Sequence, residues 1–204
     1  MVARRLLPKM VHSNCYAMGW QSSKLSSMNA RIVQPGSEIF DAIVAAPFGG
    51  IGIRTEAASV RELVYLPPHF AEKDATDTTA ALAAEQVAQY LADPDFVFSL
   101  PLMAAGSAYQ QRVWAAISAI ARGTVRTYGQ VARDIGSAPR AVGQACGANW
   151  FPLIIPCHRV TAAGGLGGFA SHADENGFHL SVKRWLLRHE GATASPWQQQ
   201  AIWP

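Results

Sequence analysis

The segment 154–160, with the sequence IIPCHRV, constrains this chain most, because it sets a cysteine and a histidine directly after an apolar run. Pro156 limits the backbone before Cys157, and the apolar residues around it indicate a buried frame. A free thiol has a pKa of about 8.5 and attacks as the thiolate, so it needs a neighbouring base. Since successive side chains of an extended strand point to opposite faces, a contact between Cys157 and His158 requires a turn or a bridging water.

Other polar residues are candidates to complete such a site. Asn149 lies eight positions before Cys157, and a His-Glu pair further on ends at Glu190. Glu190 is a candidate to orient His158, although a solvated helix end explains the same pair. A buried cysteine is usually an inert small hydrophobe, so the neighbours of Cys157, and not its burial, single it out. A zinc site of Cys146, Cys157 and His158 is an alternative, but the spacing lacks the paired close ligands of structural zinc sites.

Length and composition limit the class of protein. With 204 residues, of which 50% are hydrophobic and 15% charged, the chain can bury a real core. Three cysteines without a CxxC motif favour a reducing compartment, and the apolar runs are too short to span a bilayer. We therefore expect a cytoplasmic protein of bacterial type with no membrane partner and no metal or cofactor, and nothing indicates an oligomer.

Charge is distributed unevenly along the chain. Residues 38–100 have a net charge of −7, whereas residues 101–204 have a net charge of +5. A basic second half is typical of contact with a phosphate backbone, although a solvated basic face is an equally good explanation of charge alone. Residues 1–28 contain no acidic residue and show no periodicity, which favours a disordered extension over a signal or transit peptide, with Met28 as a natural start.

The predicted organisation is an α/β domain over 29–100, a mainly helical domain over 101–192 and a tail over 193–204. In the first domain we expect strands at 40–46, 51–54 and 62–66, and a helix from a capping Thr78 to about residue 91. Leu82, Val87 and Leu91 are predicted to share a face of that helix, and His69, after two prolines, is predicted to be an exposed loop residue.

The second domain is predicted from three kinds of helix signal. Ser107 is a good N-cap for a helix to about residue 121, with an apolar stripe that includes Trp114 and ends at Gly123. Short helices over 128–135 and 140–146, separated by Gly136, are typical of a helix-turn-helix. A last helix over 181–190 is expected to begin at Ser181, to end at Gly191 and to face inward with Val182, Trp185, Leu186 and His189.

Two residues of this domain suit a nucleic-acid interface. Arg140 begins a helix rich in small residues, including Ala141 and Gly143, which allows close approach to a partner. An enzyme that acts on a base inside a duplex must extrude it, and an arginine is a candidate to fill the gap. Tyr128 begins the preceding helix. A surface arginine and a packed tyrosine are the ordinary explanations of the same residues.

These motifs together resemble the O6-alkylguanine-DNA alkyltransferases, also called methylated-DNA–protein-cysteine methyltransferases. The resemblance covers about residues 104–191, and residues 38–100 are more weakly similar to the N-terminal α/β domain of that family. Six ordered blocks match: 106–114 (GSAYQQRVW), 127–132 (TYGQVA), 140–143 (RAVG), 147–149 (GAN), 152–160 (PLIIPCHRV) and 183–191 (KRWLLRHEG).

The resemblance implies a ribonuclease-H-like first domain and a winged-helix-like second domain. It also implies a protein that repairs double-stranded DNA, each protein molecule reacting once. Cys157 would accept the alkyl group from O6-alkylguanine, with O4-alkylthymine as a further candidate substrate. His158 would take the thiol proton through water, Glu190 would orient the imidazole and Asn149 would hold the turn that shapes the site.

The resemblance also implies roles in substrate and DNA binding. Tyr128 would help to rotate the nucleotide out of the duplex and would donate a hydrogen bond towards the purine. Arg140 would fill the gap that the rotated nucleotide leaves in the base stack. The backbone at Cys157 and Val160 would recognise the guanine edge. Ala141 and Gly143 would lie on the DNA-binding helix. A single reactive thiol without a cofactor motif is consistent with one alkyl transfer per protein molecule. The resemblance implies a monomer that acts on chromosomal DNA.

The chain departs from the family pattern at several positions. Trp150 replaces the usual proline after Asn149, Phe169 replaces a common tyrosine, and the turn 136–139 is short. The connection over 170–180 is longer than typical, and this loop closes over the substrate in the family. We therefore expect an altered pocket mouth and an altered tolerance for larger alkyl groups.

Three other functions compete with repair. An alkyltransferase-like sensor would lack the acceptor that Cys157 provides. A transcription regulator of the adaptive type would carry a cysteine-rich zinc domain, which the single N-terminal Cys15 cannot make. A cysteine hydrolase would use Cys157 and His158 with turnover, but its base is normally distant in sequence and the helix-turn-helix would have no role.

Overall fold

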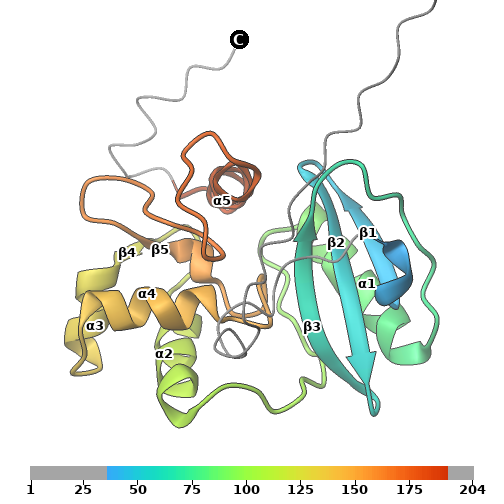
Figure 1. The fold of residues 1–204 in the computed structure, drawn as a ribbon, viewed down its shortest axis with the longest axis horizontal. Coiled ribbons are helices and arrows are strands. Elements are labelled where there is room, and N and C mark those ends of the chain that lie inside the picture. The colour runs from blue at the N-terminus through green and yellow to red at the C-terminus, as the bar shows by residue number, and fades with distance from the viewer. Residues whose placement is uncertain (1–35, 193–204) are drawn as a thin grey trace, which may run out of the picture. The chain divides into compact units, whose positions relative to one another are not determined.

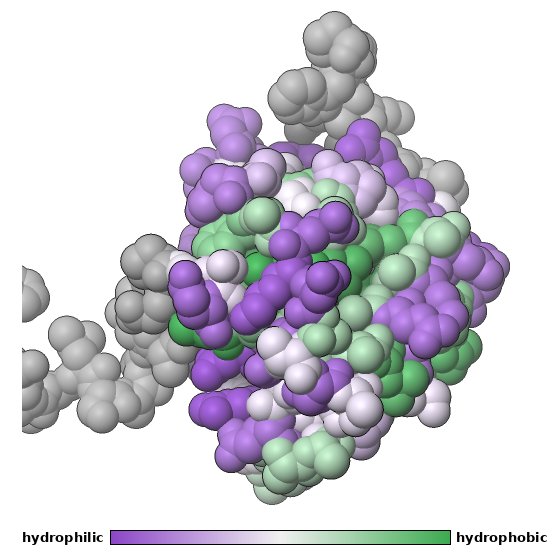
Figure 2. Space-filling model, turned by 90° about the vertical axis from the view of Figure 1, so that its right-hand side faces the viewer, coloured by the Kyte–Doolittle hydropathy of each residue, from purple (hydrophilic) through white to green (hydrophobic). Residues whose placement is uncertain are grey.

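The computed structural model describes residues 36–192, so the predicted extension 1–28 and tail 193–204 lie outside the described residues. An α/β part comes first and a mainly helical part follows (Figure 1). No helix within 36–192 is long and apolar enough to cross a membrane. The face on the sheet side shows hydrophilic residues among smaller hydrophobic patches (Figure 2).

The first part is a three-stranded antiparallel sheet in the order β1-β2-β3, with one helix packed on it. After the 3-10 turn η1 (Ser37–Ile39), its elements are β1 (Ala42–Ala46), β2 (Gly49–Glu56), β3 (Ser59–Leu66) and α1 (Thr78–Ala92). The three predicted strands are confirmed, and β2 and β3 begin earlier than the sequence predicts. His69 is exposed, as expected.

The start and the buried face of α1 differ from the prediction. Asp77, not Thr78, is the N-cap, since its carboxylate accepts a hydrogen bond from the backbone N–H of Ala80. Thr78 is already the first helical residue. The prediction that Leu82 shares a face with Val87 is also wrong, because Leu82 is 40% exposed whereas Val87 is fully buried. The buried side chains recur on one helix face, as the periodicity of a helix requires: Ala80, Ala83, Gln86, Val87 and Tyr90.

Up to residue 192, where the described residues end, the second part contains four helices and a pair of short parallel strands. Its elements are α2 (Ala108–Ser118), β4 (Arg126–Thr127), α3 (Tyr128–Asp134), α4 (Pro139–Gly147), η2 (Cys157–Arg159), β5 (Val160–Thr161) and α5 (Phe178–His189). Ser107 caps α2 as predicted, in a capping box with Gln110, and a second capping box at Thr127 begins α3. The helices α3 and α4 pack together as the predicted pair.

The last helix begins earlier than the sequence predicts. Its N-cap is Gly177, and Ser181 lies inside the helix, where its hydroxyl donates to the carbonyl of Phe178. The prediction of Ser181 as the cap is therefore wrong, because the side chain bonds back into the preceding turn. Val182 and Leu186 are buried as expected, whereas Trp185 is only partly buried. Gly191 follows the helix at a φ of 71°, the conformation of a helix terminator.

Candidate active site

Cys157 is buried at the start of the 3-10 turn η2, which provides the turn that a Cys-His pair requires. Asn149 braces this turn from inside. Its Nδ2 donates to Sγ of Cys157 at 2.8 Å and to the carbonyl of Ile155 at 2.8 Å, and its Oδ1 accepts from the backbone N–H of Phe151 at 2.9 Å. Asn149 makes these bonds with Trp150 beside it, so the tryptophan is compatible with the braced turn.

His158 is fully buried, and its Nε2 lies 2.9 Å from Oε1 of Glu190. Burial lowers the pKa of His158 below its ordinary value, and the nearby Glu190 carboxylate only partly opposes that effect. Burial alone would raise the pKa of Glu190, but His158 and Arg159 outweigh burial and hold it well below its usual range. The pair therefore consists of a neutral imidazole and an ionised carboxylate near neutral pH, which is the state a general base needs.

Glu190 has two further partners that the sequence analysis misses. Nε and Nη2 of Arg159 donate to the two carboxylate oxygens at 2.8 Å each, and Nη1 donates to the carbonyl of Ile120 at 2.6 Å. The hydroxyl of Tyr90 on α1 donates to Oε1 at 2.8 Å. A bidentate arginine fixes the plane of the carboxylate. Arg159 follows His158 directly and was a visible signal, whereas Tyr90 gives none because it lies 100 residues from Glu190.

Lys183 is a second missed residue. It is fully buried on α5, and its ammonium donates to the carbonyls of Val160, Leu166 and Gly168 at 2.8, 2.7 and 3.1 Å. Burial lowers its pKa to about 8, and the two thiols, Cys146 and Cys157, act in the opposite direction. It thus ties the strand after the cysteine to the following loop. A lysine among Val182, Leu186 and Leu187 in an apolar stripe is the signal that would have found it.

Tyr128 lies at the first position of α3, and its hydroxyl donates to the carbonyl of Gly168 at 2.9 Å. Burial, followed by Cys146 and Cys157, raises its pKa, so this hydroxyl keeps its proton. Gly167 has a φ of +67°, and a Cβ there would approach the tyrosine ring to 3.0 Å. The loop and the ring therefore fit closely together.

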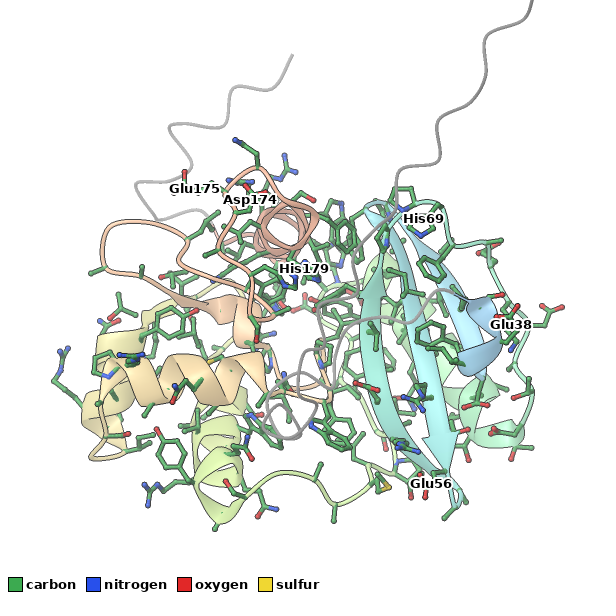
Figure 3. All side chains as sticks on the ribbon, viewed as in Figure 1. Glu38, Glu56, His69, Asp174, Glu175 and His179 are labelled. Carbon is green, nitrogen blue, oxygen red and sulfur yellow. The ribbon has the colours of Figure 1, made fainter. Side chains whose placement is uncertain are left out.

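Phe169 begins the long connection to α5. Its ring is buried 5.7 Å from the ammonium of Lys183, and its backbone pairs with that of His172 in a tight turn. Further along, the imidazole of His172 stacks on that of His179 with centroids 3.7 Å apart. Asp174 and Glu175 lie on the loop that leads into α5, close to that helix (Figure 3).

Arg140, Ala141 and Gly143 lie on α4. Arg140 is exposed in the first turn, whereas Val142 and Cys146 face the core. Gly143 is the point where α4 meets Tyr128, since a Cβ there would be 3.9 Å from the tyrosine ring. The structure thus places the Asn149–Cys157 bond and the His158–Glu190 pair on adjacent residues of η2. Tyr128 on α3 is bonded to the loop that carries Phe169, and Arg140 is exposed on α4.

A metal centre has little support among residues 36–192, where no three His, Cys, Asp or Glu side chains converge. Cys146 lies beside Cys157 without a metal-ligand arrangement: Sγ of Cys157 approaches the backbone carbonyl of Cys146 at 3.7 Å. The contact with Cys157 and burial raise the pKa of the Cys146 thiol. A protonated thiol is a poor nucleophile and a poor metal ligand.

A buried cysteine with an Asn brace and a His-Glu pair, next to two short packed helices, is the arrangement expected of a protein that reacts through its thiol. Comparison with known proteins gives the family. Residues 108–192 match the family model described as 6-O-methylguanine DNA methyltransferase, DNA binding domain. The chain belongs to this family.

Relatives are similar over about half of the chain. A methylated-DNA–protein-cysteine methyltransferase of Methanosarcina acetivorans is 40% identical over 113 residues, which is 54% of this chain and 68% of the relative. One from Mycolicibacterium paratuberculosis is 40% identical over 114 residues, covering 54% of this chain and 67% of the relative.

Solved structures extend the likeness into the α/β part. The crystal structure of the Mycobacterium tuberculosis O6-methylguanine methyltransferase has 30% identity and a TM-score of 0.61, and the match covers 78% of this chain and 96% of that one. The M. tuberculosis protein in complex with DNA has 32% identity and a TM-score of 0.60, with 76% and 94% covered. These matches support an α/β part followed by a helical part.

Proposed function

We propose that this protein repairs O6-alkylguanine in double-stranded DNA by transferring the alkyl group irreversibly to Cys157. The observation that carries this function is the buried Cys157 thiol, braced by Asn149 and adjacent in sequence to a His158–Glu190 pair. The chain is a methylated-DNA–[protein]-cysteine S-methyltransferase that acts once per molecule, because its thioether product is stable.

The reaction balances with the groups present. His158 takes the proton of Cys157 through one water molecule, and the thiolate attacks the alkyl carbon. The S–C bond forms as the C–O6 bond breaks, and guanine departs as an anion. It takes up one proton, equivalent to the one that His158 received from the thiol, by way of water, which gives the normal base and returns His158 to its neutral form. Glu190, held by Arg159 and Tyr90, stabilises the imidazolium that forms in the first step.

Tyr128 serves the leaving group. Its pKa is raised, so its hydroxyl is a proton donor and not a phenolate at neutral pH. In the extruded-base complex this hydroxyl would donate towards the purine ring and stabilise the charge that develops as guanine leaves. The backbone at Cys157 and Val160 would read the guanine edge, and Phe169 would line the same pocket.

DNA binding is assigned to α4. Arg140 fills the gap in the stack, and the small side chains of Ala141 and Gly143 let the helix approach the duplex. We propose a winged-helix-like domain over residues 101–192 and a ribonuclease-H-like domain over 29–100, in a monomer that acts on chromosomal DNA. The net charge of +5 over 101–204 suits non-specific contact with phosphates.

Intact-protein mass spectrometry tests the function. The protein is mixed with excess duplex DNA that contains O6-methylguanine, and we expect a gain of one methyl group per molecule, mapped to Cys157, that then stops. The C157A variant should gain none, and C146A is the matched control, since it alters the neighbouring buried cysteine. Tight DNA binding without methylation would indicate a sensor, and turnover of an ester would indicate a hydrolase.

A further inference from the structure

Two side chains of the described residues, those of Tyr65 and His158, have buried polar atoms without a hydrogen-bond partner. Among the side chains of residues 36–192, only Oη of Tyr65 and the two ring nitrogens of His158 are in this state. Nε2 of His158 faces Glu190 at 2.9 Å, which leaves Tyr65 Oη and His158 Nδ1. Buried groups of this kind are rare in folded proteins, and a bound water is their commonest partner.

Tyr65 reaches the site from β3. The backbone N–H of Leu63 donates to the carbonyl of Trp150 at 2.9 Å, so this strand is bonded to the segment that follows Asn149. Tyr65 lies on the same face of the strand as Leu63, two residues further on, and it is 5% exposed. Its ring packs against Phe169 with centroids 5.4 Å apart. The aromatic body of Tyr65 is thus fixed between the sheet and the substrate loop.

The electrostatics agree with this placement. Burial raises the pKa of Tyr65 well above its ordinary value, and Tyr90, Cys157 and Glu190 raise it further. The hydroxyl therefore keeps its proton and can donate a hydrogen bond. The titratable groups that act on Tyr65 are Tyr90 on α1, Cys157 on η2 and Glu190 just after α5, and the charged groups that act on His158 are Glu190, Arg159 and Lys183.

We propose that Tyr65 is a positioning residue for the proton transfer: its hydroxyl and Nδ1 of His158 hold the same water molecule, through which the proton of Cys157 passes. The inference rests on the proposed function. It makes the α/β part a contributor to the chemistry, through a side chain that no motif of the sequence indicates.

The hydrogen bonds of this water are complementary. Since Nε2 of His158 faces the carboxylate, Nδ1 is the acceptor of the neutral ring. The water donates to Nδ1 and accepts from the hydroxyl of Tyr65 and from the thiol of Cys157. As the thiol proton moves to the water, a water proton moves to Nδ1, and Tyr65 keeps its own proton throughout. With three polar partners, the site meets the usual requirement for a buried water.

The test is the Y65F variant, which keeps the ring and removes the hydroxyl. Single-turnover methyl transfer is measured with saturating O6-methylguanine duplex between pH 5.5 and pH 9 (about the range in which thiol and imidazole titrate). We expect a rate about 3- to 10-fold lower, the effect of one lost hydrogen bond. The midpoint of the acid limb should move up by about 0.5 to 1 pH unit, because the thiolate–imidazolium state is less well stabilised. The Kd for duplex DNA should stay unchanged.

Y109F is the matched control. This variant also removes a tyrosine hydroxyl. Tyr109 lies on α2, and its hydroxyl pairs with that of Ser137 at 2.8 Å. It should keep the wild-type rate and pH profile. A Y65F protein with a wild-type rate and midpoint overturns the inference and leaves the proposed function intact, whereas a wild-type protein that accepts no methyl group overturns the function itself.

A structural measurement covers the case in which Y65F does not fold. A crystal structure of the unmodified wild-type protein at better than about 1.8 Å should show a water within hydrogen-bond distance, roughly 2.6–3.2 Å, of both Tyr65 Oη and His158 Nδ1. Density that is empty at this position, or a water that contacts only one of the two atoms, overturns the inference.

Discussion

The hydroxyl of Tyr90 on α1 donates to Oε1 of Glu190 at 2.8 Å, so a helix of the α/β part supports the carboxylate that faces His158. The oxygen is buried and charged, and hydrogen bonds to buried charges are among the stronger ones. This bond ties the sheet-bearing part to the reactive site, and its removal has a measurable effect on stability.

We expect the Y90F variant to lose about 1.5–3 kcal/mol of unfolding free energy. Phenylalanine fills the same space, so the loss reports the hydroxyl and not a cavity. Urea denaturation measures it. Y109F, which breaks a hydrogen bond that is only partly buried, should lose less. Equal losses in the two variants would show that Glu190 does not depend on Tyr90.

Asn149 is expected to control the reactivity of the thiol. The N149A variant removes the donor to Cys157 Sγ and to the carbonyl of Ile155, and the acceptor for Phe151 N–H. The thiolate then lacks a fixed donor, and the turn loses its brace. The single-turnover rate should fall about 100-fold or more, the scale of one preorganised donor at a charge that develops during reaction. N176A, on the exposed loop before α5, is the control and should react at the wild-type rate.

The sequence predicts the local features of the fold well and the long-range ones poorly. Ser107 and Gly191 are placed correctly because caps depend on a few neighbouring residues. The α1 cap is misplaced by one residue because Thr78 and Asp77 are both good caps, and tertiary packing decides between them. Tyr65 and Tyr90 could not be predicted as neighbours of the site, because strand and helix packing bring them there from distant positions.

Stability should fall with acid in two stages. The pKa of His158 is lower in the folded protein than in the unfolded chain. As the pH falls below about 6.5, the unfolded chain therefore binds more protons than the folded protein, and the free energy of unfolding decreases. The pKa of Glu190 is also lowered, so its contribution is present above about 4.3 and is lost as the pH falls further. Urea denaturation of the wild type and of H158N between pH 8 and about 3 measures both stages. H158N should show a smaller first stage, in which the remaining decline comes from His179, whose pKa burial lowers to about 4; a first stage of wild-type size in this variant would contradict the assignment.

The loop before α5 is expected to set the size of alkyl group accepted. It is held at two points, by the stack of His172 on His179 and by a contact of Ser171 Oγ with the carbonyl of Gly147 at 3.4 Å. Deletion of residues 173–176 should widen the pocket mouth and raise the rate of benzyl transfer relative to methyl transfer by about 10-fold, the scale of one or two apolar contacts. Alanine replacement of Asp174 and Glu175 keeps the length and is the control. Identical ratios of benzyl to methyl transfer rate before and after deletion would contradict this prediction.

Arg140 should matter for the duplex and not for the chemistry. The residue is exposed at the start of α4, whereas the Asn149–Cys157 and His158–Glu190 contacts lie in the interior. If its side chain fills the space of an extruded nucleotide, the R140A variant must extrude the base without that support, which costs up to a few kcal/mol. We expect methyl transfer from duplex DNA to slow by about 10-fold or more, while benzyl transfer from the free base O6-benzylguanine proceeds as in the wild type.

The control variant is R112A, which removes an exposed arginine on α2 whose guanidinium lies 5.4 Å from the centroid of the Tyr109 ring. This variant shows the effect of losing one positive charge elsewhere on the protein. A parallel loss on the free base would place Arg140 in the chemistry, and equal effects of R140A and R112A on the duplex would reduce its role to general attraction of phosphates.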